Sequence, residues 1–205
     1  GLERCVADTE RLEELVNKML TLARVESGTP NAATAARPAC NLAACLRGSV
    51  AELETVAALR HVDVHLTNQA ADDLAVPLST EDCSLLITNL LLNALQHSPT
   101  DSTVELRVSL LLAPGGLSVL FTIEDHGEGI EAAALPHVFD RFYRGDPSRT
   151  RSTGGAGLGL AIAKAIVERA GGSIELDSVA GQGTRVTVRL PKTEENTAIP
   201  SASSA

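Results

Sequence analysis

Aromatic residues are scarce in this chain of 205 residues. There are three Phe, one Tyr and no Trp, and aromatics make up 2% of the sequence. Modules that bind RNA by stacking its bases need a platform of aromatic rings, so this class is excluded. The core must instead be aliphatic. Phe139, Phe142 and Tyr143 lie within five residues of one another, and this cluster requires its own explanation.

Basic residues are in the minority. Lys and Arg number 17 against 26 Asp and Glu, which gives a formal net charge of −9. Proteins that bind nucleic acid usually carry a basic surface that neutralises phosphates, so we expect no nucleic-acid partner. No apolar run reaches the ~18 residues that cross a bilayer, and no signal peptide is visible. The chain begins without Met inside a periodic pattern, which we interpret as a fragment of a longer protein.

The cysteines are few and show no spacing typical of a metal site. Cys5, Cys40, Cys45 and Cys83 include no C-x-x-C pair and have no histidines at metal-ligand spacing nearby. Four cysteines in a chain of this length indicate no disulfide framework, which favours a reducing, cytosolic setting.

Residues 2–27 have the periodicity of an amphipathic helix. Leu12, Leu15, Met19 and Leu22 recur at intervals of three and four, with charged residues on the other face. Such a stripe is typical of a helix in a bundle, so the segment needs a partner helix. Gly28 ends the helix, and the small, polar residues that follow are predicted to form a linker.

The remainder of the chain alternates helix and strand signals. Helices are predicted at 42–59, 85–97 and 157–170, with a short helical piece within 136–143. Strands are predicted at 62–66, 104–112, 117–124, 173–179 and 184–190. Residues 113–116 have the composition of a hairpin turn, residues 146–156 of a mobile loop, and residues from 192 onward of a disordered tail. These elements predict an α+β fold, a two-layer sandwich in which helices cover one face of a mixed, mostly antiparallel sheet.

The predicted helix 85–97 carries a line of polar residues. Asn89, Asn93 and His97 fall at i, i+4 and i+8, so they share one side of the helix. Buried amides need hydrogen-bond partners, or each costs roughly 1–3 kcal/mol. The line either faces a ligand or metal, or it caps neighbouring strands at the solvent edge of the helix. The helix taken alone favours the second interpretation.

Two glycine-rich segments follow. Asp125 ends an apolar strand and begins a D-x-G-x-G motif, which lets the backbone approach a ligand or simply forms an acidic turn. Residues 154–160 open a helix, whose N–H groups and positive dipole end suit phosphate oxygens. The chain has no Gly-Lys pair, which excludes a P-loop, and the third glycine of 155–159 comes one residue too early for the dinucleotide fingerprint. The loop therefore serves another nucleotide fold or merely allows tight packing.

The order of these motifs is more informative than any one of them. An Asn-bearing helix, a D-x-G-x-G turn, an aromatic–Arg segment and a G-x-G-x-G helix start follow one another within about residues 42–191. This order resembles the ATP-binding catalytic domain of sensor histidine kinases, which has the Bergerat fold. The resembling segments are the N box (89–98), the G1 box (125–130), the F box (139–144), the G2 box (155–160) and the closing turn (181–184).

The resemblance also implies a division of the chain. Residues 1–28 resemble the second helix of the dimerisation and phosphoacceptor hairpin. A linker (29–40), the ATP-binding catalytic domain (41–191) and a disordered tail (192–205) would follow.

A nucleotide site is implied by the same resemblance. Asn93 would supply an amide oxygen to Mg²⁺, a cation that prefers oxygen ligands, and would act in catalysis together with Arg144. Asp125 would accept a hydrogen bond from the exocyclic amine of adenine, which predicts selectivity for ATP over GTP. Arg141 and Arg144 would either contact phosphates at the ATP lid or form surface salt bridges. The residues implied to bind the nucleotide are Asn89, Asn93, His97, Asp125, Gly127, Gly129, Ile130, Arg141, Arg144, Gly155, Gly157, Leu158, Gly159, Leu160 and Thr184.

In this family the nucleophile is a histidine on the first helix of the hairpin. None of the five histidines of this chain lies in such a helix, so we expect the chain to bind ATP and Mg²⁺ without labelling itself. The full protein would be a homodimer that phosphorylates its own histidine and then a response-regulator aspartate. We expect the chain to be cytoplasmic, as part of a sensor kinase of the inner membrane.

Three positions depart from the family pattern. Leu92 stands where many histidine kinases carry an acid, Gln96 where Lys or Arg is frequent, and Ala156 where Thr or Ser is frequent. Without a carboxylate at position 92 water activation is poor, which favours a kinase over an ATPase. Two alternatives stay open: a serine kinase of the anti-sigma type, which would not need the helix 2–27, and a degenerate nucleotide-binding interaction module.

Overall fold

A computed structural model describes residues 2–28, 39–70, 74–113, 116–144 and 156–193 of the chain. The predictions for most of the linker, for residues 146–155 of the loop and for the tail beyond residue 193 lie outside the described residues. Lys192 and Thr193 still pair with the fold, since their backbone N–H groups donate to the carbonyls of Leu117 and Ala75, both at 2.9 Å.

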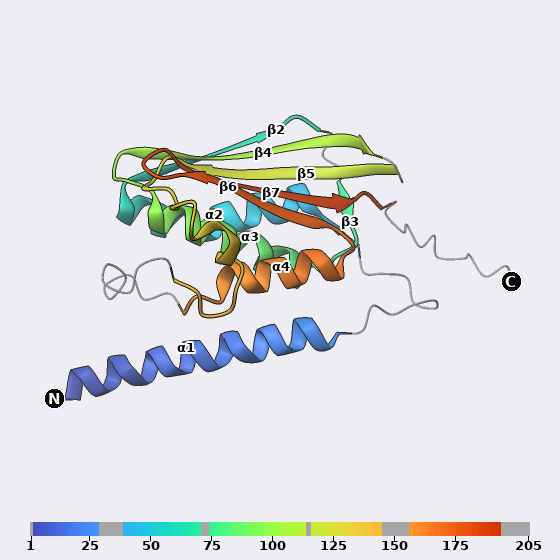
Figure 1. The fold of residues 1–205 in the computed structure, drawn as a ribbon. Coiled ribbons are helices and arrows are strands. Elements are labelled where there is room, and N and C mark those ends of the chain that lie inside the picture. The colour runs from blue at the N-terminus through green and yellow to red at the C-terminus, as the bar shows by residue number, and fades with distance from the viewer. Residues whose placement is uncertain (1, 29–38, 71–73, 114–115, 145–155, 194–205) are drawn as a thin grey trace, which may run out of the picture.

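Helices and one mixed sheet make up the fold (Figure 1). The helices are α1 (Leu2–Ser27), α2 (Leu42–Arg60), α3 (Thr80–His97), the 3-10 helix η1 (Leu135–His137) and α4 (Gly159–Arg169). The strands of the main sheet are β2 (Val62–Asn68), β4 (Ser102–Ala113), β5 (Gly116–Asp125), β6 (Ser173–Val179) and β7 (Gly183–Pro191). A separate two-stranded sheet joins β1 (Cys40–Asn41) to β3 (Ala75–Val76) in antiparallel pairing.

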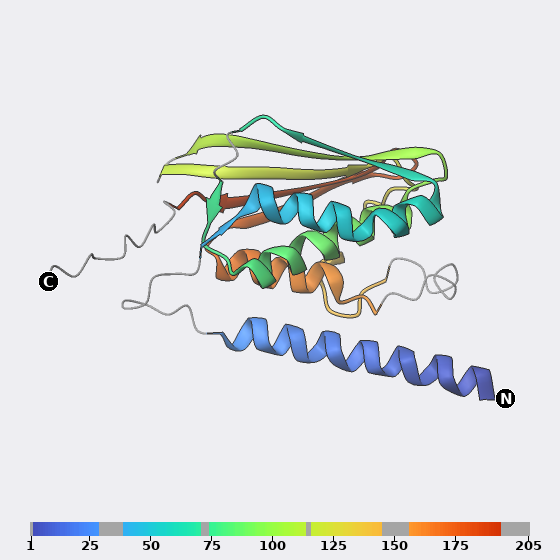
Figure 2. The same cartoon turned by 180° about the vertical axis from the view of Figure 1, so that it is seen from behind.

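The main sheet has the strand order β2-β4-β5-β7-β6. β2 runs parallel to β4 and all other neighbours are antiparallel. Helices α2, α3 and α4 cover one face of this sheet, and α1 lies outside them against α4 (Figures 1 and 2). The predicted α+β sandwich with helices on one face is confirmed.

Most predicted elements are present, with shifted ends. α3 begins at Thr80 instead of residue 85, because Ser79 caps the helix: its hydroxyl accepts from the Asp82 backbone N–H at 3.1 Å. α4 begins at Gly159 instead of residue 157, because the Gly157 carbonyl is still engaged in the loop by the Phe142 N–H at 2.9 Å. The pair β1–β3 was not predicted, since two-residue strands carry no readable period.

The core is aliphatic, as the composition requires. Phe121, 1% exposed, is the single fully buried aromatic residue among those that the structure describes. It lies among Leu, Ile and Val side chains contributed by the helices and by the covered face of the sheet. Van der Waals packing of branched aliphatic side chains therefore holds the two layers together.

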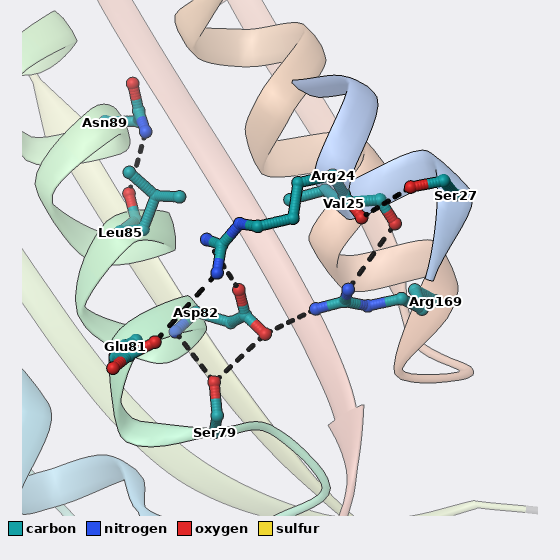
Figure 3. A network of polar contacts seen from close by, with 9 residues as sticks. All are labelled: Arg24, Val25, Ser27, Ser79, Glu81, Asp82, Leu85, Asn89 and Arg169. Atoms are coloured by element: carbon teal, nitrogen blue, oxygen red, sulfur yellow. Dashed lines mark hydrogen bonds and ion pairs between the residues drawn. The ribbon is translucent and has the colours of Figure 1, made fainter. Parts of the chain in front are cut away.

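Helix α1 is attached to the other helices by one end. Leu22 and Val25 are 4% and 1% exposed. Between them in sequence, the Arg24 guanidinium lies 3.6 Å from one Asp82 carboxylate oxygen, and Arg169 of α4 pairs with the other (Figure 3). Arg169 also donates to the Val25 carbonyl at 3.4 Å. Three helices thus share one buried carboxylate.

The earlier turns of α1 present an apolar stripe to solvent. Leu12, Val16, Met19 and Leu20 are exposed, although large and apolar. The apolar stripe predicted from the sequence therefore has two parts. Leu22 packs on the domain, whereas the apolar residues before it are exposed to solvent. No helix in the described ranges is both long and apolar enough to span a membrane.

Candidate functional site

The polar line of α3 faces the beginning of α4. The Asn89 side-chain amide N–H donates to the Leu85 carbonyl one turn earlier at 2.8 Å (Figure 3), and the amide oxygen points toward Gly159. A Cβ atom at position 159 would lie only 3.1 Å from that oxygen. Glycine at this position therefore lets the first turn of α4 approach the amide closely.

Asn93 and His97 continue the line toward the end of α3. Asn93 is half-buried, and its amide makes no hydrogen bond to any side chain or backbone group that the structure describes. His97 lies with its Nδ1 atom 3.2 Å from a carboxylate oxygen of Glu128. The line thus ends against the loop that follows β5, and the Asn93 amide remains available for a ligand.

Asp125 closes β5 as a buried carboxylate, 4% exposed. One of its oxygens accepts from the Gly127 backbone N–H at 2.9 Å. Burial raises the pKa of Asp125, although hydrogen bonds from the backbone N–H groups of Gly127 and Thr184 counteract part of the shift. Gly127 has to lack a side chain, because a Cβ atom there would lie 2.1 Å from the His97 carbonyl oxygen.

A network on β6 and β7 supports the same loop. The Ser178 hydroxyl accepts from the Ile130 N–H at 2.9 Å and lies 3.0 Å from the Thr184 hydroxyl. Thr184 is buried and pairs with Asp125 across the strands. Gly129 packs against the Val179 carbonyl, where a Cβ atom would lie at 2.0 Å. Ser178 was missed from the sequence, because only the strand register brings it opposite Thr184.

The glycine-rich loop at the start of α4, residues 154–160, is described only in its second half. Gly155 lies outside the described residues, whereas Gly157, Leu158 and Leu160 lie at the start of α4. Leu158 is the N-cap residue and makes no side-chain capping bond. The N-cap residue therefore supplies no acceptor to the first N–H groups of α4, and such N–H groups suit an anion.

The segment with the aromatic cluster joins this loop to α1. The Phe142 N–H donates to the Gly157 carbonyl, and the neighbouring Arg141 pairs with Glu26 of α1. Arg144 is half-buried, at the end of the described segment. The rings are partly surface groups, since Phe142 is 50% exposed. In this structure Arg141 thus forms a surface salt bridge with α1, the second of its two predicted roles.

Together these groups form a site of mixed polarity at one end of the helical layer. Amide oxygens of α3 offer ligands for a hard cation, the start of α4 offers N–H donors, and Asp125 offers a buried acceptor. Such a set is suited to a nucleotide with its phosphates and metal.

Residues 79–194 match the family described as histidine kinase-, DNA gyrase B- and HSP90-like ATPase. The chain is 39% identical over 136 residues to the sensor histidine kinase WalK of Bacillus subtilis, covering 66% of this chain and 22% of that protein. It is 35% identical over 199 residues to the probable sensor histidine kinase TcrY of Mycobacterium tuberculosis, covering 93% of this chain and 38% of that protein.

Solved structures give the same assignment. The mycobacterial sensor histidine kinase MprB is 27% identical with a TM-score of 0.63, covering 78% of this chain and 100% of that one. Full-length ShkA in complex with AMPPNP shares the fold, with 23% identity, a TM-score of 0.72 and coverage of 90% of this chain and 36% of that one. The chain spans less than two fifths of the length of the two curated relatives. It belongs to the histidine kinase-, DNA gyrase B- and HSP90-like ATPase family, as the ATP-binding catalytic domain of a sensor histidine kinase.

Proposed function

We propose that the chain binds ATP with Mg²⁺ and that the full protein transfers the γ-phosphate to a histidine outside this sequence. The observation that carries the proposal is the convergence of three features: the amides of α3, the loop after Asp125 and the start of α4. Phosphoryl transfer depends mainly on positioning and charge stabilisation. Groups held by three separate elements supply both.

Asp125 is the proposed adenine-binding residue. Its carboxylate is buried and lies at the end of a central strand, where the Gly127 N–H fixes its orientation. An acceptor so placed can receive the exocyclic amine of adenine, whereas guanine carries an oxygen at that position. Thr184 and Ile130, joined through Ser178, would hold the loop around the base. We therefore propose selectivity for ATP over GTP.

The phosphates are proposed to lie between α3 and the start of α4. The N–H groups at Gly157, Leu158, Gly159 and Leu160 would receive phosphate oxygens, with Gly127 and Gly129 shaping the facing loop. Asn93 would ligate Mg²⁺ and Asn89 would contact the phosphates or their waters, which fits because both amides are half-buried and oxygen is the preferred ligand. Bound there, Mg²⁺ would neutralise phosphate charge. Arg144 is proposed to stabilise the γ-phosphate during its transfer. His97 is proposed to orient Glu128 and the loop after β5.

Helix α1 is proposed to be the second helix of the dimerisation and phosphoacceptor hairpin, residues 1–28. Its exposed stripe at Leu12, Val16, Met19 and Leu20 would pack on the first helix and on a second copy. Residues 29–40 would be the linker, 41–191 the catalytic domain and 192–205 a tail. The full protein would pass its phosphoryl group to a response regulator from the cytoplasmic side of the inner membrane.

A phosphorylation assay in trans tests the proposal. The purified chain is mixed with labelled ATP, Mg²⁺ and the hairpin of the full protein. We expect acid-labile phosphohistidine on the hairpin, no label on the chain alone, and loss of labelling with N93A or EDTA. A hairpin whose histidine is replaced by alanine is the control. Acid-stable phosphoserine, or label on the chain alone, would contradict the proposal.

A further inference from the structure

Three cysteines from three different elements meet in the core. The Sγ atoms of Cys40, Cys45 and Cys83 all lie within 4.8 Å of one another. Cys40 and Cys45 are each 7% exposed, and Cys83 is 0% exposed. The sequence did not indicate this cluster, because its members come from β1, α2 and α3 and show no metal-ligand spacing.

The helices place two of these thiols in equivalent positions. Cys45 is the fourth residue of α2 and Cys83 the fourth residue of α3. The N-terminal turn of a helix carries partial positive charge, which stabilises a thiolate. Two of the three thiols thus lie near the N-terminal ends of helices.

The spacing of the sulfur atoms fits one metal ion. A metal–sulfur bond of about 2.3 Å places three sulfurs around a planar centre about 4.0 Å apart. The sulfur atoms lie within 4.8 Å of one another, which exceeds this value by less than about 1 Å. Because the three thiols come from three elements, a metal would join β1, α2 and α3.

The donor set selects for a soft ion that accepts three ligands. Thiolates bind Cu(I) and Zn²⁺ strongly, but structural Zn²⁺ is almost always four-coordinate. Asp82 precedes Cys83, yet Arg24, Arg169 and Ser79 occupy its carboxylate. No fourth ligand is offered by the groups that form this cluster in the described part of the chain. A three-sulfur site suits Cu(I), which is stable with three thiolates.

We propose that Cys40, Cys45 and Cys83 form a buried three-coordinate thiolate site for Cu(I). The site lies apart from the nucleotide: Cys83 and Asn93 are ten residues apart on α3, about 15 Å along the helix axis. The first turns of α2 and α3 lie near β3, at the end of the helical layer away from residues 139–144 (Figure 2). Cu(I) would therefore stabilise the domain without occupying the ATP site.

Metal titration of the reduced chain without oxygen tests the site. In competition with bathocuproine disulfonate, we expect one equivalent of Cu(I) per chain, an ultraviolet thiolate-to-copper absorption and a higher melting temperature. The C5S chain should bind the same one equivalent and show the same rise in melting temperature. Wild-type chain that retains no Cu(I), or binding that is lost in C5S, would overturn the proposal.

Variants assign the ligands. C83S and C40S should each weaken Cu(I) binding more than about tenfold, because a hydroxyl is a poor ligand for a soft ion. C5S is the matched control and should bind like the wild type. ATP-analogue affinity verifies that each variant is folded. One tightly held Zn²⁺ that Cu(I) does not displace, or C5S weakened as much as C83S, would contradict the assignment.

Discussion

At the scale of single residues, Asp125 is the group whose removal tests the adenine contact. A hydrogen bond that involves a charged group contributes about 1.5–3 kcal/mol. We therefore expect D125N to bind ATP at least about tenfold more weakly, since an amide is a weaker and less correctly oriented acceptor. Calorimetric titration measures the affinity. D177N is the control, because it removes an exposed carboxylate on β6. Equal ATP affinity of D125N and wild type would contradict the proposed contact between Asp125 and adenine.

The same carboxylate predicts a pH dependence. Burial raises the pKa of Asp125, so the carboxylate gains its proton at a higher pH than an ordinary aspartate does. The advantage of wild type over D125N in ATP affinity should be complete above this raised pKa and should shrink as the pH falls through it. The ratio of the two affinities, measured from neutral to acidic pH, cancels the protonation of ATP itself. A constant ratio would exclude the ionised carboxylate as the acceptor.

A substitution at Gly159 tests whether the close packing of α4 on Asn89 matters for ATP binding. Its replacement by alanine adds a Cβ atom 3.1 Å from the Asn89 amide oxygen, so the amide must move. Gly159 is the first residue of α4, so alanine there brings little of the helix-forming gain of an interior position. G159A should therefore keep a melting temperature close to that of the wild type, yet weaken ATP binding about tenfold through the displaced amide.

The control for G159A is G48A. A Cβ atom at Gly48, in the middle of α2, would meet nothing within 4 Å. G48A should raise stability by about 0.5–1 kcal/mol and leave ATP affinity unchanged. A G159A variant that binds ATP like the wild type would show that the approach of α4 to Asn89 has no part in binding.

At the scale of elements, the sequence predicts what is periodic and local. The long helices and the strands of the main sheet follow from apolar spacing and from glycine turns. The pair β1–β3 does not, because two residues show no period and their pairing depends on a contact 36 residues apart in sequence. The early start of α3 was readable from Ser79 and the acidic residues of its first turn.

Some residues of the candidate site could likewise be predicted from the sequence, and others could not. Asn89, Asn93 and Asp125 follow from motif spacing. Ser178, Glu128 and the cysteine cluster follow only from the way in which strands and helices meet, so no local pattern reveals them.

The contact between Glu26 and Arg141 links α1 to the segment 139–144, which resembles the F box. The Arg141 side chain cannot contact Glu26 and a phosphate in one conformation, so the two contacts compete. An exposed ion pair contributes about 0–1 kcal/mol, and E26Q should therefore raise ATP affinity by up to about fivefold. Fluorescent-nucleotide titration measures this. The double variant E26Q/R141A should lose the gain; a gain that persists would assign the effect to another group.

At the scale of the whole molecule, aliphatic packing holds the layers and aromatic rings gather at a surface segment. Phe121 is buried, while His137 and Tyr143 place their rings 5.5 Å apart and Lys164 lies 5.6 Å from the Phe139 ring centre. The scarcity of aromatics in the sequence thus reflects a core that does not need them. The rings of Phe139 and Tyr143 instead connect η1 and α4 beside the proposed nucleotide site.

The buried and the exposed apolar residues of α1 should have separate roles. Leu22 and Val25 are buried on the domain, whereas Val16 and Leu20 are 51% and 63% exposed. In L22A/V25A the lost contacts, about 2–5 kcal/mol for a buried Leu→Ala change, should release α1. Hydrogen exchange of α1 should then rise while ATP binding persists.

The matched variant V16A/L20A removes similar apolar volume from the open face. It should leave hydrogen exchange and ATP affinity unchanged, because those side chains are largely exposed to solvent. It should nevertheless reduce phosphorylation of the hairpin in trans, because α1 would lose the surface proposed to receive the first hairpin helix. If L22A/V25A leaves the exchange of α1 unchanged, or V16A/L20A phosphorylates the hairpin as fast as wild type, the division of α1 into a docking end and a partner-binding stripe is wrong.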